Sequence, residues 1–115
     1  MSYESPGVPV HFLSAATTNP TVIKASPGVI TSITALNTTA VLYWLKLHDT
    51  LTTPIAGTTA VVQSYPIPAS VAGNGFTINV PIKFAYGIAF TLVGAIADTD
   101  SSNAATGINL NFVYR

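Results

Sequence analysis

The sequence predicts an all-β protein: a single-domain antiparallel β-sandwich of about eight strands with a jelly-roll-like arrangement. Short apolar or alternating segments recur between turns rich in Gly, Pro, Asn and Thr, and no window has the 3.6-residue period of an amphipathic helix. The chain has 115 residues, enough for one core and too few for two domains. A jelly roll is the usual way to arrange eight such strands in two sheets, and a seven-stranded immunoglobulin-like topology is the alternative.

The first third of the chain is expected to supply an arm and three short strands. Residues 1–9 contain Pro6, Gly7 and Pro9 and are interpreted as an N-terminal arm, which leaves residues 10–115 for the sandwich domain. Such an arm is held either by a neighbouring subunit or as an edge strand of its own sheet. Strands are predicted at 10–14, 21–25 and 29–36.

The stretch AVLYWLKLHD, residues 40–49, is the longest near-continuous apolar run and contains the only tryptophan. It follows the turn 37–39, so residues 29–49 are expected to form an antiparallel hairpin. Read with a period of two, one face carries Val41, Tyr43, Leu45 and Leu47 and is assigned to the core. The other face carries Leu42, Trp44, Lys46 and His48 and is the candidate contact with a neighbouring subunit. Tyr3 and Pro9 of the arm complete the candidate interface residues.

The second half of the chain is expected to form four more strands. Residues 61–67 are predicted to lie at a sheet edge, because Pro66 cannot donate a ladder hydrogen bond. Residues 76–80 alternate clearly, and residues 107–115 alternate best of all. Residues 83–94 form one strongly apolar segment. Ile88, Phe90 and Leu92 share one of its faces, and the smaller residues Ala89, Thr91 and Val93 share the other, which suits close packing against a neighbouring layer or chain.

The composition argues for a protein that is covered by partners. Hydrophobic residues make up 49% of the chain and charged residues only 7%, and the formal net charge is zero. Ordinary soluble domains are about a quarter charged, so we infer a permanent assembly. The four basic residues are scattered, so nucleic acid is not an expected partner. No apolar run approaches the length of a membrane helix, and no secretory signal is recognisable.

No catalytic, metal or cofactor site is predicted. The segment DTDSSN, residues 98–103, has oxygen ligands at alternate positions, but it lacks the glycine and the distal glutamate of a calcium-binding EF-hand loop and is interpreted as a turn. There is no cysteine, and no nucleophile motif accompanies His11 or His48, so an enzyme is not expected. A sugar-stacking platform could use Trp44, Tyr43, Tyr65 and Tyr86, but these residue types are equally favoured at protein interfaces. The triplet Asn37-Thr38-Thr39 matches a glycosylation acceptor and is interpreted as a turn.

Two segments resemble a family of small virion proteins encoded among the structural genes of tailed bacteriophages. NTTAVLYWLKLHDT, residues 37–50, followed by Pro54 and Gly57, is similar to the pattern N-T-(S/T)-A, then Y-L-K-L-(Y/F)-D. KFAYGIAFTLVGAIADTDSS, residues 83–102, is similar to F-x-x-G-(I/L) followed by G-x-(A/I)-A-D-x-D. With the intervening Pro66-Ile67-Pro68-Ala69, the similarity covers most of the chain after Pro20. Leu42 and His48 depart from the polar and aromatic residues of the pattern.

The resemblance implies a capsid decoration or cement protein. Such a protein would be made in the cytoplasm of the host bacterium and would bind the outer surface of the virion. There it would bridge neighbouring subunits of the major capsid protein. The implied self-association is a homotrimer, with a dimer as the variant. The alternative is a glycan- or receptor-binding module of a phage fibre or spike.

Overall fold

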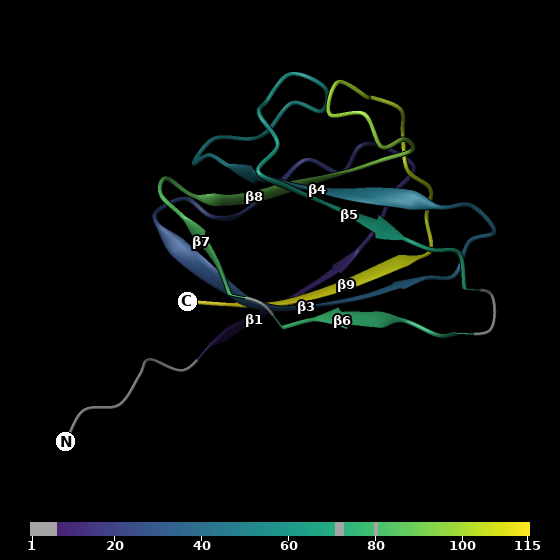
Figure 1. Ribbon diagram of the computed structural model, residues 1–115, viewed down its shortest axis with the longest axis horizontal. Coiled ribbons are helices and arrows are strands. Elements are labelled where there is room, and N and C mark those ends of the chain that lie inside the picture. Colours follow the sequence, from purple (N-terminus) through teal and green to yellow (C-terminus); the bar gives the residue numbers. More distant parts are fainter. Residues whose placement is uncertain (1–6, 71–72, 80) are drawn as a thin grey trace.

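The computed structural model describes residues 7–70, 73–79 and 81–115, and these residues form nine β-strands and no helix (Figure 1). The strands are β1 (Val8–Leu13), β2 (Thr21–Lys24), β3 (Gly28–Asn37), β4 (Tyr43–Asp49), β5 (Gln63–Ile67), β6 (Phe76–Ile78), β7 (Ile82–Phe84), β8 (Ile88–Val93) and β9 (Ile108–Tyr114). They build two antiparallel sheets that face each other, so the predicted all-β sandwich is confirmed. The expected alternating position at Val80 lies outside the described residues.

The order of the strands is that of a jelly roll. The five-stranded sheet runs β1-β9-β3, and both β6 and β7 pair with β3; the four-stranded sheet runs β2-β8-β4-β5. The pairing joins the two halves of the chain in mirrored order: β1 with β9, β2 with β8, β3 with β6 and β7, and β4 with β5. This is the pattern of a long hairpin wrapped across two sheets. β5, which contains Pro66, is an edge strand as predicted.

The predicted hairpin over residues 29–49 is wrong, because β3 and β4 belong to different sheets. The buried side chain of Asn37 fixes the crossing: its Nδ2 donates to the carbonyl of Val41 (2.7 Å) and to that of Ile67 (2.9 Å). Its Oδ1 accepts from the backbone N–H of Thr39 at 3.0 Å. Alternation along each strand shows which side is apolar, but it does not show whether the next strand lies beside it or opposite it.

The single strand expected over residues 83–94 is two strands, one in each sheet, which raises the count from about eight to nine. β7 pairs with β3, and β8 pairs with β4 and β2. The bend between them is held by the carboxylate of Asp49, which accepts from the backbone N–H groups of Ala85 (2.9 Å), Tyr86 (2.8 Å) and Gly87 (3.2 Å). A Cβ on Gly87 would lie 2.5 Å from the carbonyl oxygen of Thr50, so only glycine fits there.

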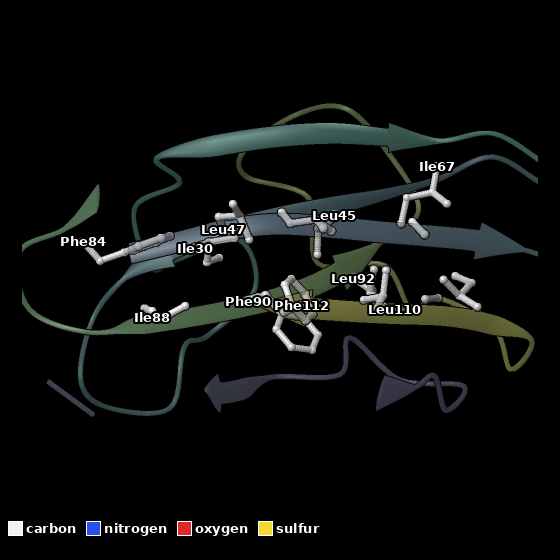
Figure 2. Packing of buried hydrophobic residues seen from close by; sticks show 14 residues of the cluster. Ile30, Leu45, Leu47, Ile67, Phe84, Ile88, Phe90, Leu92, Leu110 and Phe112 are labelled. Atoms are coloured by element: carbon white, nitrogen blue, oxygen red, sulfur yellow. The ribbon is translucent and has the colours of Figure 1, made fainter. Parts of the chain in front are cut away.

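The core lies between the sheets, where side chains of both inner faces interdigitate (Figure 2). Phe90 is at its centre: its ring meets Phe12 edge-on at 5.0 Å and stacks on Phe112 at 5.2 Å, centroid to centroid. Burying each large apolar side chain stabilises the fold by about 1.5 to 3 kcal/mol. The core cluster consists of Ile30, Ile33, Ala35, Leu45, Leu47, Ile67, Phe84, Ile88, Phe90, Leu92, Ala104, Ile108, Leu110 and Phe112.

Strand β1 includes the last two residues of the expected N-terminal arm. β1 begins at Val8, so Val8 and Pro9 pair with Tyr114 and Val113 of β9 as part of the sheet. Residues 1–6 lie outside the described residues. Leu45 and Leu47 are core residues and Tyr43 packs against the core, as predicted. Val41 precedes β4 and is 54% exposed, so its assignment to the core is wrong.

Candidate functional site

Two loops lie over the outer face of the four-stranded sheet, and we call them the roof: residues 50–62 and residues 94–107 (Figure 1). All six residues of β8 are buried, because its inner face meets the core and its outer face meets the roof. The two loops touch each other at Gly57, where a Cβ would lie 2.7 Å from the carbonyl oxygen of Thr99. The small outer-facing residues of β8 thus pack against the protein's own loops.

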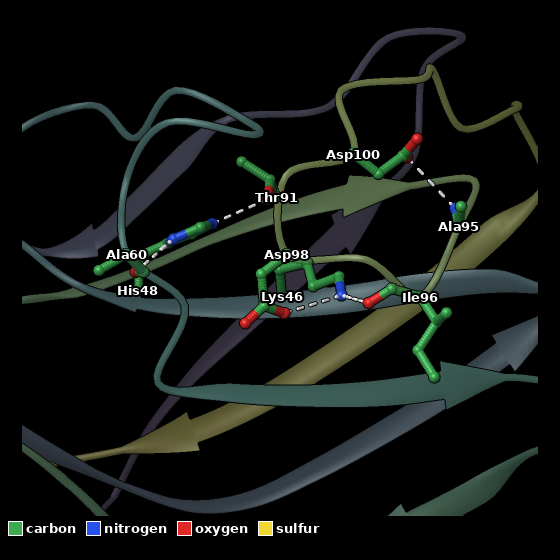
Figure 3. Close-up of polar contacts among 8 residues, drawn as sticks. All are labelled: Lys46, His48, Ala60, Thr91, Ala95, Ile96, Asp98 and Asp100. Carbon is green, nitrogen blue, oxygen red and sulfur yellow. Dashed lines mark hydrogen bonds and ion pairs between the residues drawn. The ribbon is translucent and has the colours of Figure 1, made fainter.

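Lys46 projects from β4 into the roof and is only 2% exposed. Its Nζ donates to the carbonyl oxygen of Ile96 at 2.5 Å and lies 3.4 Å from Oδ1 of Asp98 (Figure 3). The ammonium also lies 5.5 Å from the ring centroid of Trp44, within the range of a cation–π contact. A buried ammonium needs such partners, because taking it out of water without them is very costly. Lys46 therefore fixes residues 94–107.

His48 projects from β4 beside Lys46 and is 1% exposed. Its Nδ1 lies 3.0 Å from the carbonyl oxygen of Ala60 in the roof, and its Nε2 lies 2.8 Å from Oγ1 of Thr91 on β8 (Figure 3). Burial lowers the pKa of His48 below 6.5; hydrogen bonds to the backbone at Ala60 and Thr59 oppose this effect, and the nearby Lys46 adds to it. The imidazole is thus held in its neutral form between a strand and residues 50–62.

The predicted interface face of residues 40–49 divides into a covered part and an open part. Lys46 and His48 lie beneath the roof, so neither side chain can contact a neighbouring subunit while the roof stays in place. Leu42 is 41% exposed, and Trp44 is half-buried. Pro9 is exposed on β1, whereas Tyr3 lies outside the described residues.

The acidic side chains of the roof serve the roof itself. Oδ2 of Asp100 accepts from the hydroxyl of Ser102 at 2.6 Å and from the backbone N–H groups of Ser102 and Ala95, both at 3.2 Å. The hydrogen bond from the Ser102 hydroxyl is the main reason why the pKa of Asp100 is lowered. Asp98 faces Lys46. In the described part of the chain, no group of three or more His, Asp or Glu side chains could hold a metal ion, and no pocket is present.

The four aromatic residues weighed for a sugar platform do not share one surface. Tyr43 and Tyr65 pack against the core from the inner side of the sheet, whereas Trp44 points to the outer side. Tyr86 stands in the bend between β7 and β8 and is strongly exposed. The potential glycosylation acceptor Asn37 is buried, and its amide is used in the crossing between the sheets.

The outer face of the five-stranded sheet is uncovered by any described segment, and we call it the bare face (Figure 1). Its centre is formed by outward-pointing residues in register on β1, β9, β3 and β6, and these residues are His11, Leu13, Thr34, Leu36, Thr77, Asn109 and Asn111. Nδ1 of His11 lies 2.8 Å from Oδ1 of Asn111, whose Nδ2 donates to Asn109 at 3.4 Å. Leu13 is 65% exposed.

Among the described residues, no Asp or Glu side chain lies on the strands of the bare face, and Lys83 and Arg115 lie near each other at one end of its sheet. Lys83 on β7 pairs with Val29, and Val29 exchanges two backbone hydrogen bonds with Arg115. Solvent faces of small soluble proteins usually mix charges of both signs. Depletion of charged residues is instead the compositional mark of the centre of a protein interface. The alternation in residues 107–115 placed Asn109 and Asn111 opposite the core side, so the signal for this face was present in the sequence.

Comparison with protein-family models, with curated proteins and with solved structures finds no match for this chain. Within the described residues no helix is long and apolar enough to cross a membrane.

Proposed function

We propose that this protein is a structural component of a bacteriophage virion: a capsid decoration or cement protein that binds the outside of the head and bridges major capsid protein subunits. The observation that carries the proposal is the bare face. No described segment covers it, none of the described strand residues on it is Asp or Glu, and it is lined by uncharged hydrogen-bonding side chains such as Thr34, Asn109 and Asn111. A face of this composition is better suited to contact with a large protein surface than to exposure to water.

The use of the charged side chains supports a structural role over a catalytic one. Asp49 holds the bend between the sheets, Asp100 holds the roof, and Lys46 is paired with Asp98. Both nitrogens of His48 are engaged in hydrogen bonds. These side chains hold the loops and the bend in place, so the sandwich presents a rigid surface to its partners.

Self-association as a homotrimer, with a dimer as the variant, remains part of the proposal. With a formal net charge of zero, copies of the chain do not repel one another strongly. A bridging protein that is itself oligomeric can contact several capsid subunits at once and gains avidity from doing so.

The number of copies in each particle distinguishes this proposal from the alternative, a glycan- or receptor-binding module of a phage fibre or spike. Quantitative mass spectrometry of purified particles that carry this protein is expected to find hundreds of copies. A dozen or fewer copies would contradict cementing and favour the fibre or spike.

The contribution of the bare face can be tested with one substitution at two places. Thr34→Lys adds a charge at the centre of the bare face, whereas Thr53→Lys adds the same charge to an exposed position of the roof. Purified variants are mixed with particles stripped of this protein, and bound protein is measured after sedimentation. Thr34→Lys is expected to weaken attachment at least tenfold, and Thr53→Lys to leave it unchanged. Equal attachment of both variants would show that another surface meets the shell.

A further inference from the structure

Two neighbouring side chains of β4 hold one roof loop each. Lys46 binds the carbonyl of Ile96 in residues 94–107, and His48 binds the carbonyl of Ala60 in residues 50–62. The imidazole is the side chain type whose charge changes readily near neutral pH, because its ordinary pKa is about 6.5. The two loops are therefore attached by chemically different contacts.

The partners of His48 determine its tautomer. The carbonyl oxygen of Ala60 can only accept, so Nδ1 must carry the proton and donate it. In the neutral ring Nε2 is then an acceptor, and it receives the hydroxyl proton of Thr91. Adding a proton to Nε2 reverses this second hydrogen bond and places a cation in a site closed to water.

The surroundings of His48 oppose that cation more than they support it. Lys46 lies on the same face of β4 and repels it, and Asp98 of the roof attracts it. The roof segment 50–62 has no charged residue, and the residues that face His48 from β8, Ala89 and Thr91, are uncharged as well. Burial outweighs the favourable contacts, in agreement with the lowered pKa of His48.

We propose that His48 is an acid-sensitive latch: the neutral ring holds residues 50–62 on the four-stranded sheet, and its protonation releases them. The bond from Nδ1 to Ala60 is retained in the cation, so release is driven by hydration of the imidazolium and by its separation from Lys46. Residues 94–107 stay attached through Lys46. This inference does not depend on the proposed function in the virion.

Thermodynamic linkage between protonation of His48 and opening of residues 50–62 sets how strongly pH can change the open-to-closed ratio. The open form titrates with an ordinary histidine pKa and the closed form with a lower one, so acid favours the open form. For one proton, the open-to-closed ratio rises by at most tenfold for each pH unit below about 6.5. The population of the open form is therefore expected to rise as the pH falls below about 6.5, while the core stays folded.

Hydrogen exchange of the native protein between pH 7.5 and pH 5.0 tests the latch, with rates corrected for the intrinsic effect of pH. Protection of residues 51–62 is expected to fall about tenfold or more, whereas residues 94–107 and the core strands keep theirs. Fluorescence of Trp44, the only tryptophan, gives a second reading of hydration on the same strand. His48→Gln, which keeps donor and acceptor atoms without titrating, is expected to abolish the change, and His11→Gln on the bare face to retain it.

Three outcomes would overturn the latch: unchanged protection of residues 51–62 in the native protein, the same loss in His48→Gln, or an equal loss in both roof loops. If His48→Gln does not fold, the titration of the His48 ring in the native protein, followed by NMR, decides instead. A ring that titrates at pH 6.5 or above, or whose titration is not accompanied by changes in residues 51–62, contradicts the proposal.

Discussion

The outer faces of the two sheets carry similar side chains in opposite environments. Thr91 on β8 is 1% exposed beneath the roof, whereas Thr34 on β3 stands exposed on the bare face. The difference arises from the long connections: residues 50–62 and 94–107 both fold back over the four-stranded sheet, and no described connection covers the other sheet. Coverage of a sheet is thus decided by loops, and a face left uncovered remains open to partners.

The largest difference in stability is expected between two variants in which one of these threonines is replaced by lysine. In Thr91→Lys the new ammonium lies in register with the buried Lys46 and takes the hydroxyl away from His48. We expect the free energy of unfolding to fall by more than about 3 kcal/mol, because an unpaired charge is buried. Thr34→Lys is expected to change it by less than about 0.5 kcal/mol. Urea unfolding followed by circular dichroism measures both, and similar losses would mean that the bare face is also covered in the free protein.

A second pair of variants tests the contact between the roof loops. Gly57 and Gly73 have nearly the same positive φ, 81° and 85°, so an alanine at either site costs about 1 to 2 kcal/mol of backbone strain. A Cβ at position 57 also meets the Thr99 carbonyl, whereas nothing lies within 4 Å at position 73. Gly57→Ala is therefore expected to lower the free energy of unfolding by about 1 kcal/mol more than Gly73→Ala. Equal losses in thermal unfolding would show that the two roof loops are not in firm contact.

The smallest effect concerns Asp49, which joins the two sheets at the bend between β7 and β8. Burial raises the pKa of this carboxyl, but the three backbone N–H groups outweigh burial, so the net pKa is lowered. The stabilisation is present above about pH 4 and is lost as the pH falls through the lowered pKa. We expect Asp49→Asn to cost about 1 kcal/mol at pH 7. Urea titrations at pH 7 and pH 3 should show the variant and the native protein converging in acid; a gap that widens in acid would contradict this role.

The all-β class and the two-sheet arrangement were predictable, because the alternation of apolar and polar residues along a strand shows which side chains are buried. In residues 107–115 every second side chain is apolar, and in β9 Ile108, Leu110 and Phe112 are buried. Crossings between the sheets were not predictable in the same way. The hairpin over residues 29–49 and the single strand over residues 83–94 both failed at points where a polar side chain, Asn37 or Asp49, caps a distant segment.

The candidate surface was predictable only in part. Trp44, Lys46 and His48 were correctly placed on the face away from the core. Sequence alone did not show that the loops that precede β5 and β9 return to cover Lys46 and His48. Polar side chains at these positions are expected on a strand that faces solvent and also on one that is covered by loops. A buried polar side chain with hydrogen-bond partners gives the same alternation of polar and apolar residues as an exposed one. Whether a face is open depends on the paths of the connections, which short-range patterns do not encode.

The mirrored pairing of the strands has a consequence for how the protein is made. The last strand, β9, lies in the interior of the five-stranded sheet, between β1 and β3, and Val8 pairs with Tyr114. While the chain emerges from the ribosome, β1 and β3 lack their common neighbour until synthesis has passed residue 114. Such long-range pairing slows folding and leaves strand edges unpaired for longer. A polypeptide shortened before β9 would thus present two open edges and would be expected to aggregate.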